Sequence, residues 1–290
     1  MKPSITKIYH VYGPVLSWRA GNSLGIDPIG QISTCSFNCS YCQLGKIQNI
    51  TTEIKTYVAT AKIIDDLKEL ETLGRFRYED LDVITFAGSG EPTLAENLGD
   101  IIDAIKDLYK DRSKQVPISI LTNATLLIDN DVLAKAAKAD ILSLKLDAVD
   151  EASLKAINQP AAEIKFENII SGIQKFNNSY PQKSQLQIML MPKQVSDPEY
   201  ISKLAQVIHE TGVTRIQLNT PSRPKPVSST GEYWLETRGN HYKAGEAIKP
   251  DYIELKELPA LDRKTAFEIE DQLQKLCDNK LEIVNIYQRK

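Results

Sequence analysis

Apolar segments of two kinds alternate along most of the chain. Short runs rich in strand-forming residues are separated by longer stretches whose apolar residues recur at helical spacing. Besides one strand ahead of Cys35, the strand-like runs are residues 83–87, 117–124, 140–148, 186–192 and 214–221, and the helix-like stretches are residues 59–74, 94–109, 132–139, 165–177 and 198–212. Six strands joined by helices predict an α/β fold, with a parallel sheet curled into a partial (β/α)6 barrel.

The segments that follow the predicted strands are rich in glycine and polar residues. Loops at the carboxyl ends of parallel strands converge on the reaction site of an α/β fold. We therefore expect the segment around Cys35 to share one rim with five later segments, residues 88–93, 122–125, 146–148, 191–194 and 219–226.

Composition narrows the class of protein. The 290 residues are 42% hydrophobic and 25% charged, which is typical of a folded globular protein. No run approaches the roughly 20 apolar residues of a membrane span, and the first residues lack the pattern of a secretory signal. We therefore expect a cytoplasmic protein without membrane contact. The net charge of -3 provides no global field for nucleic acid, so such binding would depend on a local basic patch.

Three of the four cysteines, Cys35, Cys39 and Cys42, lie within eight positions as C-x3-C-x2-C. In a reducing compartment this cluster favours metal binding or catalysis over disulfides. Structural zinc requires four ligands, and the remaining candidates are isolated in the sequence: Cys277, His10, His209 and His241. A four-iron, four-sulfur cluster held by three cysteines instead leaves one iron open to a small molecule. A helix face carrying buried thiols is the alternative, but Ser, Asn and Gly interrupt the segment.

The stretch CSFNCSYC, residues 35–42, resembles the signature loop of the radical S-adenosylmethionine (SAM) superfamily, in which an aromatic residue, here Tyr41, precedes the last cysteine. The resemblance implies a barrel of the radical SAM type and a four-iron, four-sulfur cluster on Cys35, Cys39 and Cys42. It also implies that SAM chelates the open iron and is cleaved reductively to a 5'-deoxyadenosyl radical, which takes a hydrogen atom from a substrate. The electron would come from a donor of the flavodoxin or ferredoxin type.

Ser89, Gly90 and Glu91 resemble the superfamily's Gly-Gly-Glu motif, which holds the amino group of SAM, with serine in place of the first glycine. Gly90 permits close backbone approach, and the Glu91 carboxylate or the adjacent carbonyls can accept from an ammonium. Taken alone, the turn suits any α/β protein, with Glu91 at a helix N-terminus. Thr122 and Asn123 end the third strand, where the family often presents polar side chains to the ribose or carboxylate of SAM.

Polar residues also alternate with leucines at the end of the fourth strand. Ser143, Lys145 and Asp147 share one face, which can point into the barrel lumen and contribute to the SAM site. A buried Lys145 requires a partner, and Asp147 is a candidate. A structural ion pair or a polar outer edge explains the same pattern equally well. Weaker candidates for cofactor or substrate contact are Gln187, Gln217 and Asn219.

Residues 12–30, with the stretches CSYCQLG and TFAGSGEPTL, look like the radical SAM subfamily grouped with wybutosine-type tRNA-modifying enzymes. The likeness covers about residues 12–221. The wybutosine enzymes carry a second cluster on additional cysteines and use a flavodoxin-like partner module. Here Cys277, on a helix predicted to be structural, is the one cysteine left, so chemistry that needs a second cluster is not carried over.

Two segments carry a local excess of two positive charges. Residues 1–30 hold three Lys or Arg against one Asp, and residues 222–243 hold four against two Glu. Tyr233, Trp234 and Tyr242 lie within the second segment, which suits stacking on a base, a lid, or a solvated loop packed under the barrel. His241 lies in the same segment. A lone histidine is more often structural than catalytic, so we assign His241 no catalytic role.

The chain ends in a predicted helix and a short strand. The helix has Phe267, Ile269, Leu273 and Leu276 as apolar anchors, with Cys277 as a small core residue. No repeat or linker divides the sequence. We therefore predict a single radical SAM domain over residues 1–290, with a core of about 28–221, an N-terminal extension of 1–27 and a C-terminal extension of 222–290.

Three functions are compatible with these features. The leading one is a radical SAM enzyme acting on a nucleobase or tRNA, or on a small metabolite, although the acidic net charge counts against large RNA contacts. The second is an activase that makes a glycyl radical in a protein partner. The third is a non-enzymatic zinc-binding module.

Overall fold

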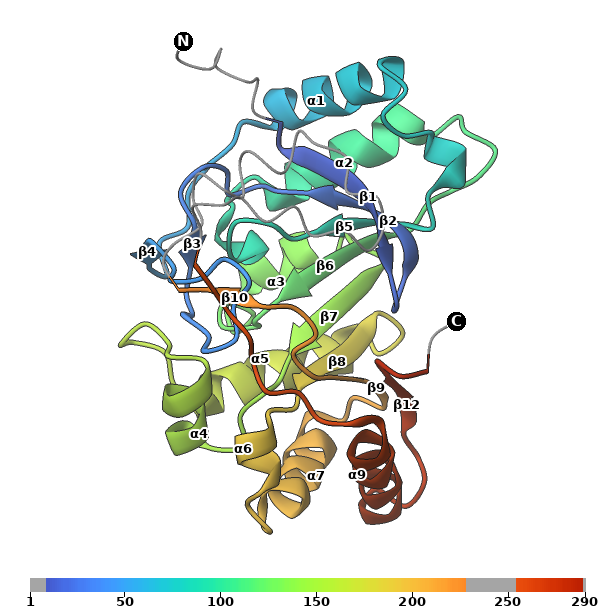
Figure 1. Ribbon diagram of the computed structural model, residues 1–290. Coiled ribbons are helices and arrows are strands. Elements are labelled where there is room, and N and C mark those ends of the chain that lie inside the picture. The colour runs from blue at the N-terminus through green and yellow to red at the C-terminus, as the bar shows by residue number, and fades with distance from the viewer. Residues whose placement is uncertain (1–8, 228–253, 289–290) are drawn as a thin grey trace.

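An eight-stranded sheet, curled into a half-barrel, forms the centre of the computed structural model, which describes residues 9–227 and 254–288 (Figure 1). In spatial order its strands are β1 (Val11–Ser17), β2 (Gly21–Ile26), β5 (Val83–Phe86), β6 (Ile118–Thr122), β7 (Ile141–Lys145), β8 (Ser184–Met189), β9 (Arg215–Asn219) and β12 (Glu282–Asn285). Strand β1 is antiparallel to β2, whereas all pairs from β2 to β12 are parallel.

Two short pairings lie outside this sheet. Strand β3 (Thr34–Cys35) pairs in parallel with β4 (Asn49–Ile50), and β10 (Lys225–Pro226) pairs antiparallel with β11 (Leu255–Lys256). Figure 1 shows β3, β4 and β10 at the same end of the sheet. Segments that are far apart in the sequence therefore meet at one rim.

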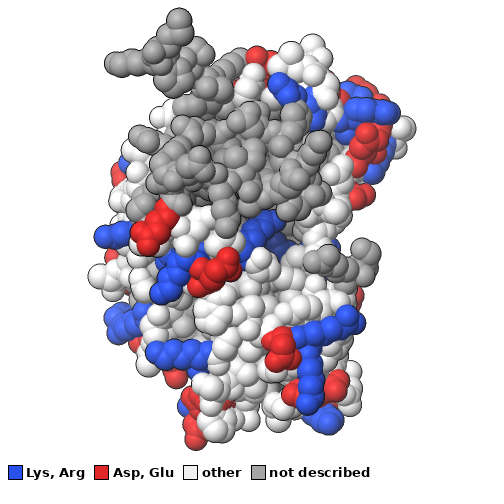
Figure 2. Space-filling model, viewed as in Figure 1, with Lys and Arg blue, Asp and Glu red and all other residues white. Residues whose placement is uncertain are grey.

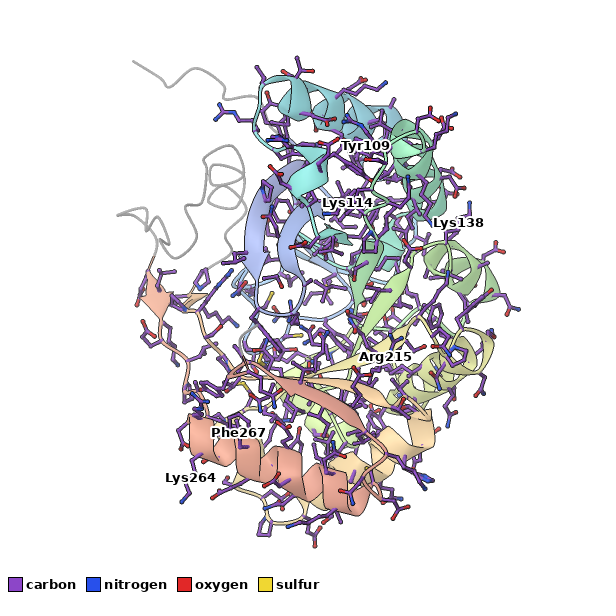
Figure 3. The ribbon with its side chains drawn as sticks, turned by 90° about the vertical axis from the view of Figure 1, so that its right-hand side faces the viewer. Tyr109, Lys114, Lys138, Arg215, Lys264 and Phe267 are labelled. Atoms are coloured by element: carbon purple, nitrogen blue, oxygen red, sulfur yellow. The ribbon has the colours of Figure 1, made fainter. Side chains whose placement is uncertain are left out.

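Helices connect the parallel strands and pack on one another in sequence along the sheet. They are α1 (Thr60–Thr72), α2 (Leu98–Tyr109), α3 (Asn130–Ala136), α4 (Glu151–Ile157), α5 (Phe166–Ser179), α6 (Pro192–Val195), α7 (Tyr200–Thr211) and α9 (Arg263–Leu276), with 3-10 turns at η1 (Tyr78–Asp80) and η2 (Pro92–Leu94). At the end of α2, the Tyr109 ring stacks on Tyr78 with centroids 4.0 Å apart (Figure 3). The Arg215 side chain donates to the backbone of Ser184 and so ties β9 to β8 (Figure 3).

Alternation of side chains gives the sheet two different faces. Fully buried aliphatic and aromatic residues, such as Phe86, Leu144 and Leu186, occupy one set of positions and belong to the same core cluster as the helices. The intervening positions of the central strands are largely polar, as Thr85 and Ser119 illustrate in neighbouring strands. The sheet thus presents its apolar face to the helices and its polar face to the inside of the half-barrel.

The fold predicted from the sequence is confirmed. The six central strands β2, β5, β6, β7, β8 and β9 lie side by side in chain order, and each predicted helix is present within a few residues of its expected bounds. The short helix α4 was not predicted, because its Glu151–Ile157 sequence is too short to show a helical period. The sheet also takes β1 and β2 from residues before 28 and β12 from residues after 221. The single-domain division with a core of about 28–221 stays a prediction.

Within residues 9–227 and 254–288, no helix combines the length and the apolar character that crossing a bilayer requires.

The core is sensitive to loss of volume at Phe86, the last residue of β5, which is 0% exposed. We expect Phe86→Ala to lower the free energy of unfolding by about 3–5 kcal/mol, because both the transfer free energy and the packing contacts of the ring are lost. Urea denaturation measures this loss. The control is Leu16→Ala on β1, where the side chain is 67% exposed and the change should stay within about 0.5 kcal/mol. Equal losses in the two variants would contradict the assigned core.

Candidate functional site

The cysteine loop, residues 35–42, follows β2 and docks on the connection between α4 and α5. The Ser40 N–H donates to the Ile157 carbonyl at 2.7 Å, and the Asn38 N–H donates to the carbonyl of Asn158 at 2.9 Å. From the connection, the Ala161 N–H donates to the carbonyl of Ser36 at 2.9 Å. The loop has little hydrogen-bonded structure of its own, so these contacts fix the positions of its thiols.

The sulfur atoms have N–H donors around them. The Phe37 N–H and the Asn123 amide point at Cys35 Sγ, with donor–sulfur distances of 3.4 and 3.6 Å, and the Asn158 amide lies 3.4 Å from Cys39 Sγ. All three thiols are partly buried. N–H donors aimed at sulfur stabilise thiolates, and such donors tune iron–sulfur clusters. The loop is therefore suited to hold an inorganic group through anionic sulfur.

The pKa values of the three thiols are raised because burial disfavours the thiolate. The pKa of Cys35 lies well above its ordinary value, that of Cys39 is about 12, and that of Cys42 is also raised. Lys225 and Lys145 act in the opposite direction on the pKa of Cys42. Free thiols here stay protonated at neutral pH, so binding a cationic group would release protons.

The candidates for further zinc ligands lie outside the cysteine loop. Cys277 is buried at the end of α9, with its sulfur 3.9 Å from the Ala205 carbonyl of α7, and His209 lies on α7. His10 precedes β1, and its N–H donates to Asp66 on α1. Over residues 9–227 and 254–288, no three or more Cys, His, Asp or Glu side chains are placed to hold a single metal ion.

Glu91 is 3% exposed, and both of its carboxylate oxygens accept hydrogen bonds within the protein. Its Oε1 accepts from the Thr93 N–H and hydroxyl at 3.1 and 2.7 Å and from the Thr122 hydroxyl at 2.6 Å. Its Oε2 accepts from the Asn123 N–H at 2.8 Å. Burial raises the pKa of Glu91, whereas these four donors favour its carboxylate. Glu91 thereby fastens the turn after β5 to the end of β6.

The turn after β5 also touches Thr34, the residue of β3 that leads directly into the cysteine loop. The Thr34 N–H donates to the Ser89 carbonyl at 2.9 Å, and the Glu91 N–H donates to the Thr34 carbonyl at 3.1 Å. A Cβ at Gly90 would lie 1.6 Å from the Thr34 oxygen, so only glycine allows this approach. The Ser89 N–H in turn donates to Asp27 at the end of β2. The predicted close approach at Gly90 is thus made by the protein's own backbone.

Asp147 joins the cysteine loop to the next strands. Its side chain is 1% exposed, and its Oδ2 accepts from the Tyr41 hydroxyl and, at 2.9 Å, from the Asn158 amide. Its Oδ1 accepts from the Met189 N–H at 2.8 Å and lies 3.3 Å from Lys145 Nζ. The pairing of Lys145 with Asp147 that the sequence predicted is therefore present in the structure. One carboxylate holds the loop, β7, β8 and the end of α4 together.

Two ammonium groups flank the loop. Lys145 Nζ lies 5.1 Å from the centroid of the Tyr41 ring, within cation–π distance. Lys225, from the β10–β11 pair, donates to the carbonyls of Ser40 and Cys39 at 3.1 and 3.4 Å. Lys225 offsets part of the negative charge that three thiolates would place at the rim, whereas Lys145 shares its charge with Asp147.

The remaining predicted positions lie along the inner face of the sheet. Gln185 donates to the Ser143 hydroxyl at 2.6 Å, so this hydroxyl already has a partner within the sheet, below the rim. Lys145 pairs in register with Gln187, which pairs in register with Gln217. The side chain of Asn219 at the end of β9 accepts from the next N–H along the chain.

Sequence reasoning missed three residues that shape the site, Asn158, Asp27 and Lys225. Asn158 follows α4 and reaches the loop only through the tertiary fold, so no local pattern marks it. The position of Asp27 directly after a predicted strand could have marked it in the sequence. In the structure, its Oδ1 accepts from the Ile29 and Gly30 N–H groups. Lys225 appeared in the sequence only as one charge of a basic segment.

Some predictions lie outside the described residues. They concern Lys2, Lys7, Tyr233, Trp234, Arg238, His241, Tyr242 and Lys243.

Comparison with known proteins gives a match to one family and to several relatives. A model described as the radical SAM superfamily matches residues 32–218. The chain is 44% identical over 233 residues to the UPF0026 protein slr1464 of Synechocystis sp., covering 80% of this chain and 81% of that protein. It is 36% identical over 248 residues to a Brachyspira hyodysenteriae protein named GTPase Obg, covering 84% of this chain but 35% of that protein.

Among solved structures, the fold is similar to one described as "Native anSMEcpe with bound AdoMet and Cp18Cys peptide". The TM-score is 0.56 at 15% sequence identity, and the match covers 90% of this chain and 62% of that chain. This likeness concerns the fold.

Gly90 offers a test of the contact between the cysteine loop and the turn after β5. We expect Gly90→Ala to lower the free energy of unfolding by about 1–3 kcal/mol or more, because the added methyl group displaces the Thr34 carbonyl. Chemical denaturation measures the change, and hydrogen exchange at the Thr34 and Glu91 amides reports the local opening.

The matched control is Gly99→Ala in α2, where a Cβ would meet only flexible atoms of Lys135 and Lys138, at 3.3 Å. This variant should be unchanged or up to about 1 kcal/mol more stable, because alanine favours the helix. If both glycine variants unfold at the same denaturant concentration, the contact at Gly90 is not the constraint described here.

Proposed function

This chain belongs to the radical SAM superfamily, as an enzyme of that superfamily, and we propose that Cys35, Cys39 and Cys42 hold its four-iron, four-sulfur cluster. The observation that carries the proposal is the arrangement of these thiols at the carboxyl ends of parallel strands, with N–H donors on Cys35 and Cys39. Given one electron from a reductant, the bound cluster and SAM would together supply a 5'-deoxyadenosyl radical, with methionine as the other product, for hydrogen-atom abstraction from the substrate.

We propose that SAM binds where the turn after β5 meets the cysteine loop. Because both Glu91 oxygens already accept hydrogen bonds, backbone carbonyls beside Glu91 are better placed than its carboxylate to accept from the SAM ammonium. Gly90 supplies such a carbonyl, and Ser89 supplies a second one that also accepts from the Thr34 N–H. Thr122 and Asn123 hold Glu91 in place, and the Asn123 amide also reaches Ser36 at 2.7 Å. Glu91 would thus position the turn rather than bind the cofactor directly.

Tyr41, Lys145 and Asp147 are proposed to form the opposite wall of the SAM site. The Tyr41 hydroxyl donates to Asp147, which fixes the ring beside Cys42, and Lys145 lies over the same ring. This arrangement orients the loop and keeps a cation beside the sulfur ligands. Ser143 lies two residues before Lys145 on β7, and Gln185 donates to its hydroxyl. Ser143 would therefore support the inner face of the sheet below the SAM site rather than contact SAM at the rim.

The substrate is proposed to be a nucleobase, free or in tRNA, or a small metabolite. Figure 2 shows basic and acidic side chains interspersed over the described part of one face, rather than cations gathered in a single patch. A long RNA backbone is bound mainly through clustered Lys and Arg. The charge distribution in this view therefore favours a substrate that enters the half-barrel over one spread across the surface. The reducing partner is proposed to be a one-electron donor of the flavodoxin or ferredoxin type.

The cysteines supply the direct test. We expect Cys35→Ala, Cys39→Ala and Cys42→Ala each to abolish 5'-deoxyadenosine formation from SAM with dithionite, because each removes one of three sulfur ligands. The measurement is chromatography of the product after anaerobic reconstitution with iron and sulfide. The matched control is Cys277→Ala, which removes a thiol buried between α7 and α9 and should retain both iron and product formation.

The same preparations separate the alternatives. Brown wild-type protein with about four irons per chain supports the cluster, whereas colourless protein that binds zinc supports the zinc module. Product formation that persists in the triple cysteine variant would overturn the assignment. Cleavage of SAM that is stimulated only by another protein, which then carries a glycyl radical, would indicate the activase instead of a nucleobase or metabolite enzyme.

A further inference from the structure

The inner face of the half-barrel carries a row of polar side chains one step below the rim. Lys145 on β7, Gln187 on β8 and Gln217 on β9 are paired in register across three neighbouring parallel strands. Paired residues of a sheet point to the same side, and Lys145 points toward Tyr41 and the cysteine loop. The two carboxamides therefore face the inside of the half-barrel, beside the proposed site of SAM.

The Gln217 carboxamide oxygen is buried and has no hydrogen-bond partner among residues 9–227 and 254–288. Gln187 beside it is only 5% exposed. Buried polar atoms are nearly always paired, because an unpaired buried acceptor has lost its hydrogen bonds to water without a replacement. One step further down, the corresponding groups are paired, since Gln185 donates to Ser143 at 2.6 Å. The row at Gln187 and Gln217 thus keeps an acceptor that the described part of the chain leaves unpaired.

The charge of this row excludes a strongly ionic ligand. Its one charged side chain, Lys145, lies 3.3 Å from Asp147, so the pair is neutral as a unit. The other two members are uncharged carboxamides, each of which presents an acceptor next to a donor in one plane. Neighbouring strands are about 5 Å apart, so one small planar ring can reach both carboxamides.

We propose that Gln187 and Gln217 bind an uncharged, planar amide or lactam edge of the substrate, with a ligand N–H donating to the Gln217 carboxamide oxygen. This assignment rests on the proposed function, since it places the substrate beside the SAM site. The complement of a carboxamide is an N–H next to a C=O, as carboxamide side chains show when they bind base edges in pairs of hydrogen bonds. The row makes Gln187 and Gln217 specificity-determining residues for that edge.

Small probes test the proposal on the whole, cluster-loaded protein in the presence of SAM. Ligand-detected NMR titration compares uracil with 1,3-dimethyluracil, and benzamide with N,N-dimethylbenzamide, because each second member lacks the N–H. We expect the N–H member to bind at least tenfold more tightly in at least one pair. Preference confined to uracil identifies a cyclic lactam, and preference confined to benzamide identifies an open amide. Equal binding within both pairs overturns the proposal.

The variant Gln217→Met removes the acceptor and keeps a side chain of similar length. We expect it to bind each N–H probe as weakly as the methylated probe and to unfold at a higher urea concentration, because an unpaired buried acceptor has been removed. A purely structural glutamine would give a lower midpoint instead, and that result contradicts the proposal. The control Gln206→Met lies on the exposed face of α7 and should change neither measurement.

Iron content and 5'-deoxyadenosine formation are measured on the same samples. A wild-type protein that loads no cluster or cleaves no SAM refutes the proposed function, whereas one that does both but shows no N–H preference refutes only the assignment of Gln187 and Gln217.

Discussion

The site depends on two buried carboxylates, Glu91 and Asp147, whose oxygens all require hydrogen-bond donors. The residues that supply these donors are thereby held in position around the cysteine loop. A buried carboxylate without such donors is costly, so the groups that supply them are held in place. Glu91 takes its donors from the turn after β5 and the end of β6. Asp147 takes its donors from the cysteine loop, from β7 and β8, and from the end of α4. Between them they connect the cysteine loop with the ends of four neighbouring strands, β5 to β8.

This arrangement explains how a loop without regular structure can present three thiols in a defined way. Asn123, next to the Glu91 network, approaches Cys35, and Asn158, within the Asp147 network, approaches Cys39. The Asn158 amide thus serves Asp147 and a sulfur at once, whereas Asn123 reaches Glu91 through its backbone N–H and Cys35 through its side-chain amide. Lys225, from β10, also donates to the loop at the Ser40 carbonyl. The proposed cluster would thus be held by residues that are already ordered for other reasons.

The two faces of the sheet divide stability from chemistry. Alternate residues such as Phe86 and Leu144 form the core with the helices, and their neighbours in sequence face the inside of the half-barrel. Because the core positions supply the burial, the inner positions are free to be polar, as Gln187 and Gln217 are. The same alternation lets one strand contribute both to folding and to the proposed substrate site.

The sequence by itself determined the fold class, the order of the six central strands and the three-thiol motif, because each depends on local periodicity or on spacing within a few residues. It also identified Lys145 with Asp147 as a pair, since two positions along a strand share a face. The bond from Glu91 to Thr122 and the approach of Asn158 to Cys39 were decided by the tertiary structure alone. Those contacts join segments 31 and 119 residues apart, and only the packing of strands and helices brings such segments within hydrogen-bond distance.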